Sequence, residues 1–383
     1  MATAPKIAPQ LDVDAQLDTA SILVCCGSGG VGKTTTAAAL ALRAAERGRR
    51  TVVLTIDPAR RLAQSMGLTE LDNVPRAVVG VDTAKGGSLD AMMLDMKRTF
   101  DEIVLTHAEP AKAEAILANP FYQALSSSFA GTQEYMAMEK LGQLRASGDY
   151  DLVVVDTPPT RSALDFLDAP QRLTTFLDGR MIRILLAPAK ASGKAYLKVV
   201  SAGFNVFTGV LAKIIGATVL QDVSQFVAAL ETMFGGFRER AQATYDLLKA
   251  PGTAFVVVAA PERDALREAA YFVERLAQEQ MPLAGLVVNR VHRSAATSLT
   301  AERSIAAAQS LEDADGSPLA AAVLRLHADR VLLAAREVRL QERFTSAHPG
   351  VPVVEVAAQP GDVHDLDGLR AVGADLAGPA LTA

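Results

Sequence analysis

The chain has 383 residues, of which half are apolar, 5% are aromatic and none is tryptophan. This length allows one large α/β domain or two domains with a substantial core, and the composition excludes a disordered chain. A formal net charge of −5 argues against a general nucleic-acid-binding protein, which normally presents a basic face.

The N-terminal stretch contains acidic residues and prolines but no apolar run of the kind that a signal peptide carries. We expect residues 1–18 to be a flexible arm, residues 19–377 to form a single domain and residues 378–383 to be a flexible tail. The tail lacks the basic amphipathic helix of a membrane-surface anchor. The expected location is therefore cytoplasmic, with peripheral contact with a membrane as the alternative.

The most informative stretch covers residues 27–35 and reads GSGGVGKTT, which matches the motif G-x-x-x-x-G-K-[ST]. A β-branched apolar run precedes it and an Ala/Leu-rich run follows it, which predicts a strand, a loop and a helix in that order. Glycines let a backbone approach phosphates, and a helix start supplies N–H donors. The residues expected to bind a nucleoside triphosphate are Gly29, Gly30, Val31, Gly32, Lys33, Thr34 and Thr35.

Two side chains of this loop have specific expected roles. Lys33 would reach the β- and γ-phosphates and act in catalysis, and the Thr34 hydroxyl would ligate Mg²⁺. The two cysteines of the chain, Cys25 and Cys26, are neighbours in the preceding strand and so point to opposite faces. Since no C-x-x-C occurs, we expect neither zinc nor an iron–sulfur cluster.

Six apolar runs read as strands buried on both faces, because they are nearly continuous instead of alternating. They cover residues 21–26, 50–56, 151–155, 254–259, 283–288 and 351–356. Helical patterns between them predict an α/β fold with an open, mainly parallel sheet covered by helices on both sides. Ligands of such sheets bind beyond the carboxyl ends of the strands.

An aspartate follows two of the predicted strands at that end. Asp156 is expected to hold Mg²⁺ through a water molecule. Asp57 would orient or deprotonate the attacking water, a role that depends on hydrogen-bond reach. The alternative for each residue is a cap or turn at the end of a strand.

Two regions outside the predicted sheet, at about residues 88–148 and 170–250, read as a helical subdomain. Residues 199–220 are apolar and long enough to span a membrane, but Lys213 and three glycines argue against a span. Residues 223–237 have apolar side chains at helical spacing. Three interpretations remain open: a groove or lid for an apolar client segment, ordinary packing, and peripheral membrane contact.

Four blocks of the sequence together resemble a known family. GSGGVGKTT, TIDPARRLAQSMG, DTPPTRSALDFLDAP and VVNRV occur in the order found in the ArsA-like ATPases, which include arsenite-pump subunits and tail-anchored-protein targeting factors. The resemblance implies a P-loop NTPase with a twisted sheet and a helical subdomain, which uses ATP and Mg²⁺ and works as a face-to-face dimer. It also implies that Asp57 orients the water, that Asp156 begins the second switch, that Asn289 reads the adenine and that Pro360 lies near the base.

The chain departs from this family at one position of the loop. At the position of Ser28 the family usually has a lysine, which crosses the dimer to the partner's nucleotide. A cation supplied in trans matters by a factor of about 10³–10⁵ in related phosphoryl transfers. Three explanations are open. Arg60 or Arg61 compensates for the missing lysine, hydrolysis is slow, or the chain pairs with a related ATPase that keeps the lysine. We expect such a heterodimer rather than a homodimer.

The leading interpretation is an Mg²⁺-dependent ATPase whose nucleotide cycle drives a dimer and an apolar helical subdomain. Its expected client is an apolar protein segment, and no nucleic-acid partner is expected. One alternative is a nucleotide-gated regulatory or binding subunit with little hydrolysis of its own, which Ser28 favours. Another is a positioning ATPase associated with a membrane. An arsenite site is not expected, because it requires a cluster of thiolates.

Overall fold

The computed structural model of the chain describes residues 8–57, 61–120, 122–123, 126, 132–158, 239–294, 296, 298–314 and 316–378. The chain divides into two compact units. The sheet unit comprises Met1–Met93, Gly148–Ala163 and Leu248–Ala383, and the helical unit comprises Leu94–Ser147 and Leu164–Leu247.

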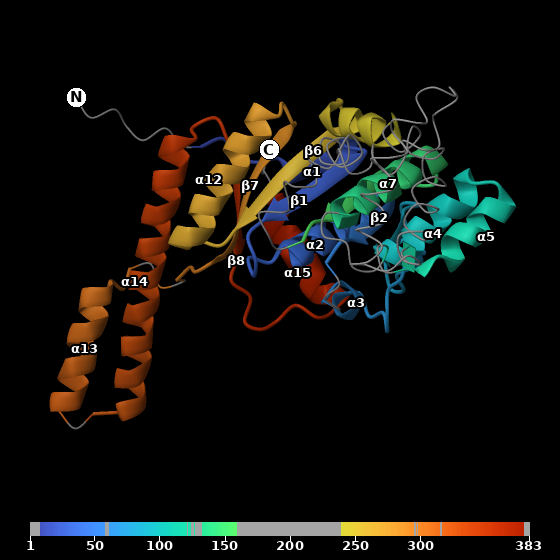
Figure 1. The fold of residues 1–383 in the computed structure, drawn as a ribbon. Coiled ribbons are helices and arrows are strands. Elements are labelled where there is room, and N and C mark those ends of the chain that lie inside the picture. The colour runs from blue at the N-terminus through green and yellow to red at the C-terminus, as the bar shows by residue number, and fades with distance from the viewer. Residues whose placement is uncertain are drawn as a thin grey trace, which may run out of the picture. The chain divides into compact units, whose positions relative to one another are not determined.

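The described residues of the sheet unit form one sheet with the strand order β3-β4-β2-β5-β1-β6-β7-β8. Figure 1 labels β1, β2, β6, β7 and β8 of this sheet. The strands are β1 Ile22–Gly27, β2 Arg50–Thr55, β3 Arg76–Ala77, β4 Ser88–Met93, β5 Leu152–Asp156, β6 Thr253–Ala259, β7 Leu283–Val291 and β8 Val353–Ala357. All neighbours pair in parallel except β3, which is antiparallel to β4. The predicted α/β fold with an open, mainly parallel sheet is confirmed.

Helices of the sheet unit lie on both faces of this sheet. The helices of this unit are α1 Val13–Thr19, α2 Lys33–Glu46, α3 Arg61–Ser65, α12 Arg263–Gln278, α13 Ala301–Asp313, α14 Pro318–Ala347 and α15 Leu366–Ala377. Helix α13 packs on α14. The crossover through α2 connects β1 to β2 in one direction along the sheet, and the crossover through α12 connects β6 to β7 in the other. Because such crossovers are right-handed, α2 and α12 lie on opposite faces.

Strand β4 corrects one expectation. Its residues, Ser88–Met93, were expected to be helical, but they pair in parallel with β2 along the whole length of that strand. Leucine, alanine and methionine favour helices in isolation, and pairing with a neighbouring strand overrides that preference. The first predicted helical region therefore contributes a strand between β2 and the edge strand β3 before it enters the helical unit.

Helix α1 corrects a second expectation, that residues 1–18 form a flexible arm. Asp12 caps the helix by accepting a hydrogen bond from the Ala15 N–H at 2.9 Å. Leu17 is completely buried, and Leu11 and Val13 are also part of the core. The described part of this segment, from residue 8 onward, is thus integrated into the sheet unit, because its apolar side chains have a core to enter.

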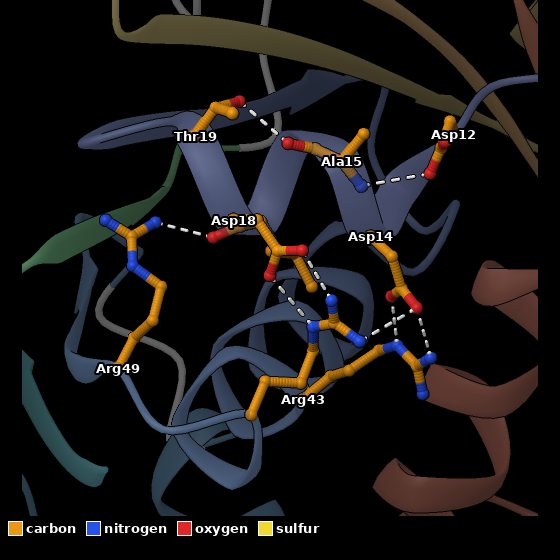
Figure 2. Close-up of polar contacts among 9 residues, drawn as sticks. Asp12, Asp14, Ala15, Asp18, Thr19, Arg43 and Arg49 are labelled. Carbon is orange, nitrogen blue, oxygen red and sulfur yellow. Dashed lines mark hydrogen bonds and ion pairs between the residues drawn. The ribbon is translucent and has the colours of Figure 1, made fainter.

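Charged residues join α1 to α2 in what we call the α1–α2 ion-pair cluster: Asp14, Asp18, Arg43 and Arg47. Figure 2 labels Asp14, Asp18 and Arg43 of this cluster, and Arg43 donates from Nε to Asp14 Oδ1 at 2.6 Å. Arg47 donates to both aspartates. Arg49, just after α2, donates to backbone carbonyls of residues 17 and 20. Acidic side chains that suggest a solvated arm in the sequence therefore attach α1 to α2, the helix that follows the loop of the GSGGVGKTT motif, here called the phosphate loop.

The helical unit contains α4 Met96–His107, α5 Pro110–Ala118 and α7 Thr132–Ser147 among its described residues. Asp95 caps α4, and Pro110 occupies the first turn of α5, where its missing N–H costs no hydrogen bond. Tyr122 is buried and donates to Asp101 at 2.5 Å. The apolar insert at 199–237 lies outside the described residues. None of the helices in the described part of the chain combines the length and the apolar character that a membrane span needs.

Candidate nucleotide site

The phosphate loop lies between β1, which ends at Gly27, and α2, which begins at Lys33. Gly27 packs so closely on β6 that a Cβ atom there would lie 2.1 Å from the carbonyl oxygen of Val258. Gly32 has a φ of +91° and forms the N-cap of α2 without a side-chain cap. The first turn of α2 therefore presents its positive end to the loop, which is the usual way for a helix to bind a phosphate.

Lys33 is buried within the loop. Its ammonium donates to the backbone carbonyl of Ser28 at 2.8 Å, so the lysine side chain folds back along the loop that it follows. Burial lowers the pKa of Lys33 below its usual value, and the nearby carboxylate of Asp156 opposes this shift. A cation that is short of solvent and close to an anion is well suited to bind a phosphate oxygen.

Asp156, the last residue of β5, lies at the centre of the site and is fully buried. Its Oδ2 accepts hydrogen bonds from the hydroxyls of Thr34 at 2.8 Å and Thr55 at 2.9 Å. Its Oδ1 has no hydrogen-bond partner within the described part of the chain. Burial raises the pKa of the Asp156 carboxyl to about 6, although the two hydroxyls favour the ionised form.

This donor set fits Mg²⁺. The ion prefers oxygen ligands, keeps several waters and binds proteins through one or two carboxylates. Asp156 supplies a buried carboxylate oxygen that has no hydrogen-bond partner among the described residues, and the Thr34 hydroxyl is hydrogen-bonded to the other oxygen of the same carboxylate. No cluster of three or more His, Cys, Asp or Glu side chains able to hold a metal occurs among the described residues.

Thr55 is a residue that sequence reasoning did not single out. It ends β2, and its hydroxyl both donates to Asp156 and accepts from the Asp57 N–H at 3.2 Å. The one available signal was a hydroxyl residue directly after the apolar run of residues 52–54. Asp57 itself is half-buried, and its charge raises the pKa of Asp156. The structure therefore brings Lys33, Thr34, Asp57 and Asp156 together at the carboxyl ends of β1, β2 and β5.

Asn289 lies near the end of β7 and contacts the phosphate loop. Its Nδ2 donates to the carbonyl of Val31 at 2.9 Å, and its Oδ1 accepts from the Arg290 N–H at 2.9 Å. Pro360 follows β8, on the side of the sheet where the parallel strands end, and is exposed. The arginines expected to replace the missing lysine, Arg60 and Arg61, have side chains outside the described residues, as does the second switch after residue 158.

The two cysteines of β1 are buried beneath the loop. Burial raises the pKa of the Cys25 thiol well above its usual range and that of Cys26 to about 12. Both thiols therefore stay protonated at neutral pH, and protonated thiols are poor metal ligands and poor nucleophiles. Their role in this structure is to fill the core.

The chain is similar to known ATPases. The family described as anion-transporting ATPase matches residues 20–312. "ATPase GET3" of Malassezia globosa is 32% identical over 151 residues, which are 39% of this chain and 43% of that protein. "ATPase GET3" of Podospora anserina is 27% identical over 270 residues, 69% of this chain and 71% of that protein. A "putative arsenical pump-driving ATPase" of Halobacterium salinarum is 33% identical over 187 residues, 45% of this chain and 27% of that protein.

Proposed function

Because the chain belongs to the family of anion-transporting ATPases, we propose that its sheet unit binds ATP with Mg²⁺ at the phosphate loop and hydrolyses it. The observation that carries this proposal is the fully buried Asp156 carboxylate. It is hydrogen-bonded to the first turn of the helix after the loop, and its second oxygen is unpaired within the described residues.

Thr34 and Asp156 would hold the ion, the aspartate through a water molecule. Mg²⁺ held by these two residues would neutralise the negative charge that develops on the phosphate oxygens. The protein's own contribution is to fix the loop backbone and to hold the Lys33 ammonium within reach of the phosphates. The side chains of Lys33 and Thr34 are both held before the nucleotide arrives, because Lys33 donates to the Ser28 carbonyl and Thr34 donates to Asp156.

Asp57 would orient the attacking water. It follows β2 directly, and the hydrogen bond from its N–H to the Thr55 hydroxyl fixes the backbone at the point where the carboxylate begins. A half-buried carboxylate beside the phosphate site has the accessibility that contact with a water requires. The same aspartate lies close enough to Lys33 to stabilise its charge.

The working assembly is a dimer in the cytoplasm, and its other subunit is a related ATPase with a lysine at the position of Ser28. Support for the unlike partner comes from the serine itself, which cannot supply a positive charge to the nucleotide of a neighbour. The ATP cycle would control binding of an apolar protein segment by the region of residues 199–237. A nucleotide-gated regulatory subunit with little hydrolysis is the alternative that the same serine favours.

Steady-state ATP hydrolysis by the purified chain, measured beside its mass by light scattering, tests the proposal. We expect Asp57→Asn to lower turnover by about 10²-fold or more with ATP binding retained. Asp313→Asn, an exposed aspartate at the end of α13, is the matched control and should have no effect. Turnover that survives Asp57→Asn would overturn the catalytic role. Tight ATP binding by the wild type without turnover would overturn self-sufficient hydrolysis by this chain and point to a missing partner subunit, the next step being to find it.

A further inference from the structure

The end of β7 is distorted where it approaches the phosphate loop. The pairing of β7 with β8 shifts register between Val288 and Val291, and Arg290 adopts a left-handed conformation with a φ of 64°. Such a conformation is costly for a residue with a side chain and persists where the surroundings enforce it. The residue within this irregularity, Asn289, is only 8% exposed.

The hydrogen bonds of Asn289 fix the orientation of its amide. The Arg290 N–H can only donate, so the atom that faces it at 2.9 Å must be the amide oxygen. The Val31 carbonyl can only accept, so the atom that faces it at 2.9 Å must be the amide nitrogen. The side chain therefore connects β7 to the middle of the phosphate loop, and a reversed amide would lose both bonds.

The loop is shaped to receive this side chain. A Cβ atom at Gly32, the residue after Val31, would lie 2.2 Å from Nδ2 of Asn289, which is closer than van der Waals contact allows. Gly32 also ends the loop, because α2 begins at Lys33. The contact with Asn289 therefore holds the loop at the point from which Lys33 and Thr34 are directed toward the phosphates.

We propose that Asn289 is a positioning residue for the phosphate loop, which holds the Val31–Gly32 backbone in its phosphate-binding shape whatever base the nucleotide carries. This inference rests on the proposed function in taking the loop as a phosphate site. It differs from adenine recognition in what it requires of the ligand. A residue that reads the base affects only nucleotides, whereas a residue that shapes the loop affects every polyphosphate that binds there.

Isothermal titration of the full chain with Mg²⁺–ATP and with Mg²⁺–tripolyphosphate, which has no base, separates the two roles. Asn289→Asp keeps the acceptor for the Arg290 N–H but places an oxygen against the Val31 carbonyl. We expect it to weaken both ligands by a similar factor, about tenfold or more, because a buried acceptor loses its donor. Asn289→Ala, which introduces no charge, should weaken both as well and serves if the aspartate variant does not fold.

The control is Asn119→Asp in the helical unit, where the asparagine is also 8% exposed and accepts a hydrogen bond from the Tyr122 N–H. It should leave both affinities unchanged. A loss for ATP alone would overturn the inference and assign the amide to the base, and unchanged affinities in both Asn289 variants would overturn it outright. If the wild type binds neither ligand, the proposed function itself fails, and the inference fails with it.

Discussion

Truncation of Leu17 to alanine measures how far α1 stabilises the sheet unit. The leucine side chain is completely buried, and the substitution removes three carbon atoms from it. At about 0.8 kcal/mol per buried methylene-sized group, the lost transfer free energy is about 2.4 kcal/mol. A residual cavity adds to this, and buried Leu→Ala changes generally cost about 2–5 kcal/mol. We expect the free energy of unfolding of the sheet unit to fall by about 3 kcal/mol.

The assay must report on the sheet unit, because the two units of the chain need not unfold together. Scanning calorimetry gives the Tm, and hydrogen exchange of the α2 amides gives the local free energy of opening. The matched control is Leu319→Ala, the same chemical change at a leucine that is 75% exposed on α14. If both variants unfold and exchange like the wild type, α1 does not stabilise the unit, and the reasoning from its burial is refuted.

Three further outcomes are expected. Thr55→Val removes a hydrogen-bond donor to the buried Asp156 carboxylate with little change of side-chain shape. It should lower the free energy of unfolding by about 1.5–3 kcal/mol, as measured by urea titration. An unchanged urea midpoint would contradict this expectation. The pKa of Asp14 is lowered from 3.8, mainly by its hydrogen bond to Arg43, so the stability that Asp14 contributes is present above pH 4 and lost as the pH falls below it. The difference in the free energy of unfolding between wild type and Asp14→Asn should therefore shrink as the pH falls below 4. A difference that stays constant down to pH 2 would exclude this linkage. Gly27→Ala forces a methyl group against a backbone carbonyl of β6 and should lower the Tm more than any exposed Gly→Ala change, as calorimetry can check.

The central strands could be predicted from the sequence because each is a nearly continuous apolar run, and such runs have few alternatives in an α/β protein. β4 could not, since Leu89, Ala91 and Met92 are helix formers whose extended state depends on pairing with β2. α1 could not either. It has seven residues, and the arginines that hold it lie about 30 positions away in the sequence, beyond the reach of local patterns.

In the candidate site, too, local sequence patterns predict some features, and others depend on residues far away in the chain. The loop and the two strand-end aspartates could be predicted because motif and position suffice for them. The contribution of Thr55 could not, because its partner is 101 residues away and nothing in the sequence connects them. Asn289 could be placed at the ligand-binding ends of the strands because it follows the predicted strand 283–288, but its role came only from the family resemblance. Its bond to Val31 spans 258 positions of the chain. What the sequence conceals here is the set of polar contacts between strands.

The shared carboxylate of Asp156 has a mechanical consequence. β5 lies between β1 and β2 in the sheet, and one oxygen of its last residue holds a hydroxyl from each side. The helix after the phosphate loop and the turn that carries Asp57 are thereby linked through a single atom, across about 10 Å of sheet. When a ligand draws the Thr34 hydroxyl away from that atom, the strength of the remaining bond to Thr55 changes in the same event. Asp156 Oδ2 thus couples the end of β2 to the occupancy of the phosphate loop.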